Sequence, residues 1–325
     1  MSENRSSFPK EYPPYRIFWN WELTHDCNYR CSYCETWRDD VKTPEYVEPS
    51  EWKEIWDRIF DIYYTCLVRF SGGEPSVYPG FIDIVSAVAE KHSVDITTNL
   101  SFDVKEFVKK VTPGNVAVSA SFHSEFNDIH DFLERVLYLH NNGIISTICY
   151  VAYPPHLDRL QHYKSVVEEK NIMFKFLPFT GEYNGKKYPE EYTDEEKALM
   201  EDTAHAAKDE TARELNTNWY EWNAEKRDSE EGVQKTELCR MGQMYAMIHT
   251  DGHVTRCCGA GSQVLGNIRD KDFRLLEDPM PCDVEHCPCF KAMLVDNEAK
   301  WKGMWDALPH KKYKIPIDAQ KENND

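Results

Sequence analysis

Three cysteines lie within eight residues near the start of the chain, in the segment CNYRCSYC. Cys27 and Cys31 are four residues apart, and Cys34 follows three residues later. Four thiolates would complete a tetrahedral zinc site, and His25 or Asp26 beside the loop could supply the missing ligand. Alternatively, three cysteines can hold a four-iron cluster and leave one iron free for an exogenous ligand, because soft thiolates suit iron–sulfur chemistry. The loop therefore predicts a metal site, and in the second case this site has an open position.

A second group of cysteines lies towards the end of the chain: Cys239, Cys257, Cys258, Cys282, Cys287 and Cys289. Clustered thiols in a reducing compartment indicate metal or redox chemistry rather than a disulfide framework. Asp251 and Gly252 lie between two short apolar runs and predict a hairpin, which would bring Cys239 and Cys257 towards each other. Four of these thiolates could also hold a zinc ribbon, so the metal is left open by the spacing alone.

The overall composition disfavours two classes of partner. The net charge is −18, and an acidic surface without a stripe of Lys or Arg repels a phosphate backbone. The apolar runs are far shorter than the about 20 residues that span a bilayer. The first residues, MSENRSSFPKEYPPY, lack the apolar stretch of a secretory signal. We therefore expect a cytoplasmic protein that binds neither nucleic acid nor a membrane.

Six predicted strands alternate with predicted helices over the first half of the chain. The strands are expected at residues 15–23, 66–70, 93–99, 115–122, 144–153 and 173–179. The helices between them are expected at residues 48–64, 80–92, 103–111, 127–143 and 157–171. Such alternation is typical of a parallel sheet with right-handed crossovers, either open or curved into a partial barrel. In both architectures ligands bind at the C-terminal ends of the strands, where the first cysteine loop lies.

The residues at these strand ends carry a resemblance to a known family. Tyr33 directly precedes the last cysteine of the loop, and the segment SGGEP at 71–75 ends the second strand about forty residues downstream. The segment TTN at 97–99 ends the third strand, and SAS at 119–121 ends the fourth. Together these motifs resemble those of the radical SAM superfamily. The resemblance implies an α/β fold, a partial (β/α)6 TIM barrel over residues 15–184.

The resemblance also implies two cofactors in the barrel. Cys27, Cys31 and Cys34 would hold a [4Fe–4S] cluster whose free iron binds S-adenosylmethionine (SAM). An electron from a flavodoxin or ferredoxin-type donor would break the C5′–S bond of SAM, and the 5′-deoxyadenosyl radical would abstract hydrogen from a substrate. The residues expected to bind SAM are Tyr33, Gly72, Gly73, Glu74, Pro75, Thr98, Asn99, Ser119 and Ser121. The two glycines lack a Cβ, which would let the backbone approach a ligand closely.

The C-terminal cysteines resemble those of the auxiliary-cluster extension called SPASM, or its shorter twitch form. Gly252 lies five residues before Cys257, and the segment VLGNI follows. The remaining cysteines are too few for two clusters, so one auxiliary [4Fe–4S] cluster is expected. Cys258 would point the other way because side chains alternate along a strand. The expected ligands are Cys239, Cys257 and Cys287, with Cys282 or Cys289 as the fourth.

The resemblance and the shifts in composition divide the chain into five parts. An N-terminal arm at 1–14 precedes the barrel at 15–184. Residues 185–235 are charged and predict a helical linker or lid. A β-hairpin followed by a helix forms the expected auxiliary-cluster domain at 236–302, and a polar tail follows at 303–325.

Three residues are candidates for roles in catalysis. His123 directly follows the fourth strand, and Cys149 and Tyr150 lie in the fifth. A thiol that faces the barrel interior could donate hydrogen to a substrate radical. Core packing is the simpler interpretation of Cys149, because a free cysteine behaves as a small apolar residue.

These features favour a radical SAM oxidoreductase that acts on a small metabolite, such as an aminocyclitol or sugar. Its auxiliary cluster would assist the oxidation of this substrate, either a dehydrogenation or the formation of a bond. One alternative is a maturase of a ribosomally synthesised peptide, which forms a crosslink or thioether or epimerises a residue. Only about fifteen residues precede the first strand, so a peptide-recognition domain is not expected there. A second alternative is a non-catalytic, zinc-stabilised binding protein.

Overall fold

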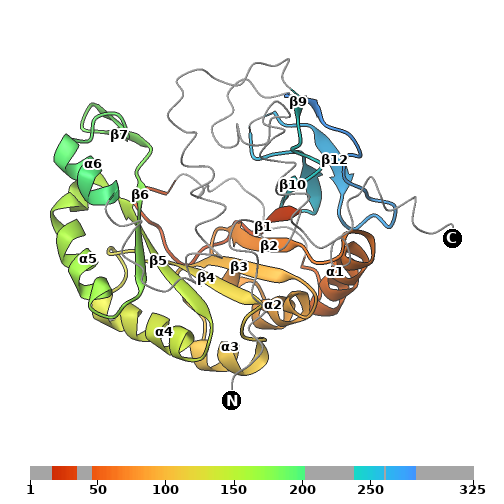
Figure 1. Cartoon of the computed structure of the whole chain (residues 1–325), viewed down its shortest axis with the longest axis horizontal. Coiled ribbons are helices and arrows are strands. Elements are labelled where there is room, and N and C mark those ends of the chain that lie inside the picture. The colour runs from red at the N-terminus through yellow and green to blue at the C-terminus, as the bar shows by residue number, and fades with distance from the viewer. Residues whose placement is uncertain (1–16, 35–45, 202–237, 260, 283–325) are drawn as a thin grey trace.

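The predicted parallel sheet is present, and further strands extend it. The computed structural model describes residues 17–34, 46–201, 238–259 and 261–282. Nine strands form one sheet in the order β12-β11-β10-β1-β2-β3-β4-β5-β6. The strands from β1 to β6 pair in parallel, and the sheet curves while β12 and β6 remain its edges (Figure 1). The predicted partial barrel is therefore confirmed.

The barrel elements follow the predicted order along the chain. The strands are β1 (Phe18–Thr24), β2 (Leu67–Gly72), β3 (Ser93–Thr98), β4 (Val116–Ser121), β5 (Ile145–Ala152) and β6 (Met173–Pro178). The helices are α1 (Pro49–Tyr63), α2 (Phe81–Ala89), α3 (Val104–Lys110), α4 (Ile129–Asn141) and α5 (Leu160–Glu168). The helices lie along the outer, convex side of the sheet (Figure 1).

Local sequence explains where several helices begin and end. Asp103 and Asp128 precede α3 and α4, and each carboxylate accepts hydrogen bonds from two backbone N–H groups of the first turn. Gly143 follows α4 with φ +82°, as expected for a glycine that ends a helix. The predicted helix at 157–171 begins differently, because its first residues belong to a 3-10 turn, η2 (Pro154–Arg159).

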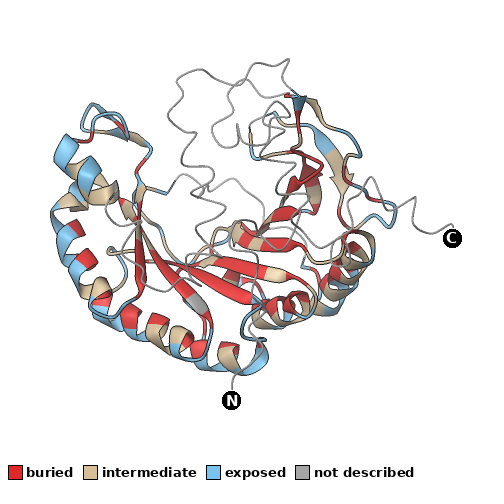
Figure 2. Cartoon of the chain, viewed as in Figure 1, coloured by how far each residue is buried: buried red, intermediate tan, exposed pale blue. Residues whose placement is uncertain are grey.

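The convex face of the sheet is mostly apolar, whereas the concave face carries polar and apolar residues together. Alternate residues point to opposite faces of a strand, so each strand contributes to both. The convex face is apolar and buried against the helices; it includes Trp19, Trp21, Val68, Phe70, Ile96, Val118, Ile148, Tyr150 and Phe174. The concave face carries Asn20, Glu22, Arg69, Ser71, Asp95, Thr97, Ser119, Ser121, Thr147, Cys149 and Lys175. Burial accordingly concentrates between strands and helices (Figure 2).

The C-terminal strands continue the barrel sheet. The predicted hairpin is present as β10 (Tyr245–Ile248) and β11 (His253–Thr255), which pair antiparallel. β10 also pairs in parallel with β1, and β12 (Val264–Asn267) pairs with β11. A second, short pair joins β9 (Leu238–Cys239) to β13 (Met280–Pro281). Cys257, which follows β11, is thus linked to the first cysteine loop through one continuous sheet, whereas Cys239 and Cys282 lie on the separate β9–β13 pair. The sequence did not indicate this connection.

The predicted linker at 185–235 is described only at its start. There the chain forms a short hairpin of β7 (Gly181–Tyr183) and β8 (Lys186–Tyr188), followed by α6 (Asp194–Glu201). The rest of the predicted linker, the arm at 1–14 and the tail at 303–325 lie outside the described residues. None of the helices that the structure describes is long and apolar enough to cross a membrane.

A buried histidine behind the sheet makes stability depend on pH. His92 is 1% exposed; its Nδ1 accepts a hydrogen bond from the Cys66 N–H at 3.2 Å, and its Nε2 lies 3.0 Å from the Trp56 carbonyl oxygen. Burial lowers the pKa of His92 to about 4. Below about pH 6.5 the His92 side chain therefore binds a proton in the unfolded chain, whereas in the folded protein it stays neutral until the pH approaches 4. Stability from this residue is present above about pH 6.5 and lost as pH falls to 4.

We predict that His92→Gln destabilises the protein at pH 7 and that this difference shrinks as the pH falls. About 3 kcal/mol of the difference in unfolding free energy should disappear between pH 7 and pH 4, because each pKa unit corresponds to about 1.4 kcal/mol. Urea denaturation followed by circular dichroism at several pH values measures it. His162→Gln, at an exposed position, is the matched control. A difference that stays constant with pH would contradict the prediction.

Candidate active site

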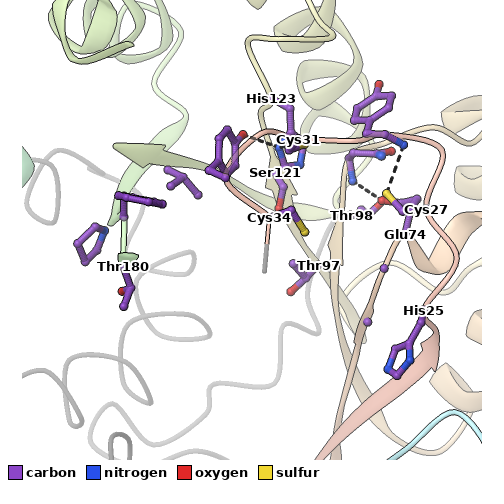
Figure 3. A pocket seen from close by; sticks show the side chains of 18 residues that line it. His25, Cys27, Cys31, Cys34, Glu74, Thr97, Thr98, Ser121, His123 and Thr180 are labelled. Carbon is purple, nitrogen blue, oxygen red and sulfur yellow. Dashed lines mark hydrogen bonds between the residues drawn. The ribbon is translucent and has the colours of Figure 1, made fainter. Parts of the chain in front are cut away.

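A pocket of about 360 Å³ lies at the C-terminal ends of the barrel strands, beside the first cysteine loop (Figure 3). This volume is in the range of small-molecule sites. The structure brings most residues predicted at the site into the wall of this pocket. They are Cys27, Cys31, Tyr33, Cys34, Gly72, Gly73, Glu74, Thr98, Asn99, Ser121 and His123.

Two glycines hold the cysteine loop against the end of β2. The backbone N–H of Gly73 donates to the Thr24 carbonyl at 2.7 Å, and the N–H of Glu74 donates to the Asp26 carbonyl at 2.8 Å. A Cβ on Gly72 would lie 2.2 Å from the Thr24 oxygen, and one on Gly73 would lie 2.3 Å from the Asp26 oxygen. The sequence interpretation assigned these glycines to the approach of a ligand. Both glycines line the pocket, and the structure adds a second reason for them, because the backbone at 24–26 occupies the space of a Cβ.

Glu74 organises the end of β3. Its side chain is 2% exposed, and its carboxylate accepts hydrogen bonds from the Thr98 hydroxyl at 2.6 Å and the Asn99 N–H at 2.6 Å. The Ser76 N–H donates to the same carboxylate at 3.0 Å. Burial raises the pKa of Glu74, and these hydrogen bonds oppose the rise. A carboxylate has about four acceptor positions, so one remains for a ligand.

Side chains from the next two strand ends fix the cysteine loop from its other side. The Asn99 amide donates to the Asn28 side chain at 2.9 Å, and Asn28 donates to the Ser101 hydroxyl at 2.7 Å. After β4, the carboxylate of Glu125 accepts the N–H of Ser32 at 2.9 Å and also its hydroxyl. The loop that carries the cysteines is therefore held by three different strand ends.

His123 lies against two residues of the loop. Its Nδ1 is 2.8 Å from the Tyr33 hydroxyl and 3.3 Å from Cys31 Sγ. Burial lowers the pKa of His123 to about 4, so the ring is neutral at pH 7. Burial, with the neighbouring Cys31 and Glu125, raises the pKa of Tyr33. The phenol therefore keeps its proton, and its hydroxyl and His123 Nδ1 are hydrogen-bond partners in a direction set by the His123 tautomer.

The three loop thiols form a soft donor set at the pocket wall. Burial raises the pKa of Cys31 to about 12, with Cys34 and Glu125 adding to the rise, and burial also raises the pKa of Cys27. Iron binding would displace these protons, since the thiolate is the ligand. The Tyr29 N–H already points at Cys27 Sγ at 3.4 Å. Within the described residues, no group of three or more His, Cys, Asp or Glu is arranged to hold a metal ion.

Four predicted residues lie outside the pocket wall. Pro75 is buried in η1 (Pro75–Val77), and Ser119 lies deeper on the concave face, where its hydroxyl donates to Asp95 at 3.1 Å. Cys149 also faces the concave side, beside Ser121. Tyr150 is 1% exposed and packs among the rings of Phe122, Tyr163, Phe174 and Phe176 on the convex side, so it does not face the pocket as a catalytic residue would.

Several lining residues were not predicted. Tyr29 lies between the cysteines, and Thr97 belongs to the TTN motif, so both lie next to predicted residues. His25, which the sequence offered only as a ligand that completes a zinc site, also lines the pocket. Val151 and the segment 178–180 come from the ends of β5 and β6. These strand ends carry no polar motif, and only the curvature of the sheet brings them opposite the cysteine loop.

A carboxylate at the end of β1 links the pocket to the C-terminal hairpin. Glu22 Oε2 lies 2.9 Å from His249 Nδ1 and 3.4 Å from Nε2 of His25, which lines the pocket. Burial tends to raise the pKa of Glu22, but the hydrogen bonds and charges of the two histidines outweigh it, and the pKa is lowered. His249 Nε2 lies 2.9 Å from the Thr255 hydroxyl, which in turn donates to the Cys257 carbonyl at 2.9 Å.

The second group of cysteines is partly described. Cys239 lies in β9, Cys257 follows β11, and Cys282 follows β13. Cys239 is the register partner of Met280, so Cys282 lies close along the neighbouring strand. Cys258 is exposed. The predicted ligands Cys287 and Cys289 lie outside the described residues, as does the helix predicted after them.

Comparison with known proteins identifies the barrel. A model of the radical SAM superfamily matches residues 21–164. Residues 21–164 form a radical SAM domain. This segment contains the cysteine loop and the strand ends that line the pocket up to η2. The resemblance of the barrel motifs to the radical SAM superfamily is therefore confirmed.

Curated relatives match this radical SAM domain over part of their length. The GTP 3′,8-cyclase of Pectobacterium atrosepticum is 31% identical over 139 residues, which are 40% of this chain and 41% of the relative. The GTP 3′,8-cyclase of Stenotrophomonas maltophilia is 32% identical over 104 residues, 30% of each chain. The matched segment thus spans about two fifths or less of these relatives.

Solved structures share the fold over more of the chain. The structure of anSMEcpe with bound AdoMet is 17% identical, with a TM-score of 0.55 over 78% of each chain. SuiB of Streptococcus suis, bound to its precursor peptide SuiA, is 16% identical, with a TM-score of 0.54 over 81% of this chain and 65% of that one. These similarities show that the fold of the radical SAM domain and the strands beyond it occurs in other proteins.

We predict that Gly73→Ala displaces the cysteine loop of the radical SAM domain. A Cβ at 2.3 Å from the Asp26 oxygen must push backbone, so the change should cost at least about 1–3 kcal/mol of stability and reduce iron uptake by the loop. Urea denaturation and iron analysis after anaerobic reconstitution measure both effects. Ser76→Ala is the nearby control, since its buried hydroxyl has no hydrogen-bond partner. Unchanged stability and iron content would contradict the prediction.

Proposed function

We propose that this chain is a SAM-cleaving oxidoreductase with an auxiliary iron–sulfur site. The observation that supports it is the convergence of three loop cysteines and the ends of five strands, β2 to β6, on one pocket, most of which lies within the radical SAM domain. Cys27, Cys31 and Cys34 would hold a [4Fe–4S] cluster, for which their soft thiolates are suited. When bound, that cluster supplies the electron that breaks the C5′–S bond of SAM.

The residues of the pocket have distinct roles in this proposal. Glu74 offers its one remaining acceptor position to the ammonium group of SAM, while its other positions hold the turn after β3. The hydroxyls of Thr97 and Ser121 line the same wall and suit the ribose or carboxylate of SAM. The neutral His123 and the protonated Tyr33 fix the Cys31 side of the loop and exclude water from it.

The concave face below the pocket would bind the substrate. It carries many more polar side chains than the convex face, and an ion pair joins Arg69 to Asp95 at 2.6 Å. Cys149 lies on this face, and burial raises its pKa to about 11, opposed by the charge of Lys175. The thiol therefore keeps its hydrogen and could transfer it to a substrate radical. Such a surface suits a small polar metabolite, such as an aminocyclitol or sugar.

A peptide substrate is the second candidate. The solved structure of SuiB with its precursor peptide shares the fold of this chain. The concave side of the sheet is compatible with either kind of substrate, and the reducing partner would be a flavodoxin or ferredoxin-type protein in both cases. Transfer of deuterium from a labelled candidate into 5′-deoxyadenosine distinguishes them, because only the true substrate donates the abstracted hydrogen.

We predict that Cys31→Ala abolishes SAM cleavage. Loss of one of three ligands should prevent assembly of the SAM-binding cluster, so reductive production of 5′-deoxyadenosine should fall at least about a hundredfold. Chromatographic assay of 5′-deoxyadenosine after reduction measures it. Cys66→Ala removes a core thiol far from the pocket wall and should leave the rate unchanged. Retained cleavage in Cys31→Ala would contradict the assignment.

We predict that Cys257→Ala separates SAM cleavage from product formation. The auxiliary site should be lost, so iron should fall from about eight to about four per chain, while 5′-deoxyadenosine is still produced. Iron analysis and product assay on the same preparation measure both. Cys258→Ala is the adjacent control and should retain all iron. Unchanged iron and turnover in Cys257→Ala would remove this residue from the auxiliary site, and zinc in the wild-type protein would favour a structural role.

A further inference from the structure

A buried arginine lies at the centre of the second cysteine site. Arg256 is 2% exposed and directly follows β11. Its Nε donates to the Met241 carbonyl at 2.7 Å, and its Nη1 donates to the Pro281 carbonyl at 2.5 Å. Its Nη2 donates to the carbonyls of Cys239 at 2.9 Å and Met280 at 2.5 Å. One guanidinium thus joins two backbone segments, 239–241 and 280–281, to its own.

Each of these segments carries or directly precedes a cysteine of the second site. The carbonyl that accepts from Nη2 belongs to Cys239 itself, and Pro281 directly precedes Cys282. Arg256 directly precedes Cys257. The pairing of β9 with β13 supports the same arrangement, because Met280 is the register partner of Cys239. The side chain therefore fixes three cysteine backbones relative to one another.

The thiol of Cys257 is also oriented in advance. The Gly259 N–H donates to Cys257 Sγ at 3.4 Å, and the Cys257 thiol donates to the Ser262 hydroxyl at 3.3 Å. The first site shows the same local geometry, in which the Tyr29 N–H points at Cys27 Sγ two residues earlier. Donors aimed at a sulfur stabilise its thiolate form, which is the form that binds metal.

The buried charge of Arg256 has an unfavourable desolvation free energy, so its presence at this position is informative. Removing an ion from water costs several kcal/mol even after relaxation, and an apolar side chain could pack the same strands at lower cost. Arginine stays charged in proteins, and its fork can serve several acceptors at once. A group held by thiolates carries net negative charge, and a fixed cation beside it offsets that charge and favours uptake of an electron.

We infer that Arg256 is a positioning residue that assembles the auxiliary cluster site and raises the reduction potential of the cluster bound there. This inference rests on the proposed function, since it requires an iron–sulfur cluster at the second site. Two effects are expected from one side chain. Its hydrogen bonds align the cysteines, and its positive charge stabilises the reduced state.

The test uses the full chain with Cys31→Ala, so that only the second site holds iron. Arg256→Met removes the charge and the hydrogen bonds, whereas Arg256→Lys keeps the charge and loses the fork. The readouts are iron content after anaerobic reconstitution and the midpoint potential from a titration monitored by electron paramagnetic resonance. Arg274→Met is the matched control, because Arg274 is exposed and also donates to a backbone carbonyl.

We expect Arg256→Met to lose iron and to shift the potential of the remaining cluster to more negative values. The equilibrium constant for reduction of the cluster should fall about tenfold or more. A tenfold fall corresponds to a shift in midpoint potential of ~59 mV for a one-electron couple. Arg256→Lys should lose iron but keep a potential near that of the parent. The control should match the parent in both readouts. When Arg256→Met is made in the wild-type chain, where Cys31 is intact, SAM cleavage should persist. This result would show that the barrel of the variant is folded.

Different results overturn different statements. A parent-like potential and iron content in Arg256→Met would reduce Arg256 to an ordinary packing residue and overturn the inference. Equal potential shifts in the Met and Lys variants would overturn the role of the charge. Zinc instead of iron at the second site of the parent would overturn the auxiliary cluster of the proposed function, before Arg256 is considered.

Discussion

The contact between the glycines after β2 and the backbone at 24–26 is the constraint on which the pocket depends. The N–H groups of Gly73 and Glu74 donate to the carbonyls of Thr24 and Asp26. No Cβ on either glycine fits between these two backbone segments. This contact holds the cysteine loop over the strand ends rather than out in solvent. Glu74 follows directly and fixes the end of β3 with its buried carboxylate. Two glycines and one acid thereby position the thiols against the polar wall that would receive SAM.

The curved sheet separates packing from chemistry. On the convex side, aromatic and aliphatic residues pack against five helices. Trp21, for example, contacts the rings of Trp52, Trp56 and Phe70. The concave side keeps hydroxyls, thiols and charges, because an open barrel does not need to fill its interior with apolar side chains. Stability and substrate binding therefore depend on opposite faces of the same strands, and the polar face can vary with little cost to the core.

The two cysteine sites are joined through β1. β10 pairs with β1 on the side opposite β2, and Glu22 of β1 lies between a pocket histidine and His249 of the hairpin. Hydrogen bonds continue from His249 through Thr255 to the carbonyl of Cys257. Arg256 then holds the far side of the second site with four further hydrogen bonds.

The sequence by itself determined the order of strands and helices, the hairpin at Gly252 and the motifs of the radical SAM domain. These follow from local periodicity, turn residues and short spacings, which a single segment contains. The tertiary structure alone decided that Tyr150 faces the helices, that the glycines accommodate backbone, and that β10 extends the barrel sheet. It also revealed Arg256 as a central residue. Each of these depends on atoms more than ten residues apart in sequence, and no local pattern records which distant groups meet.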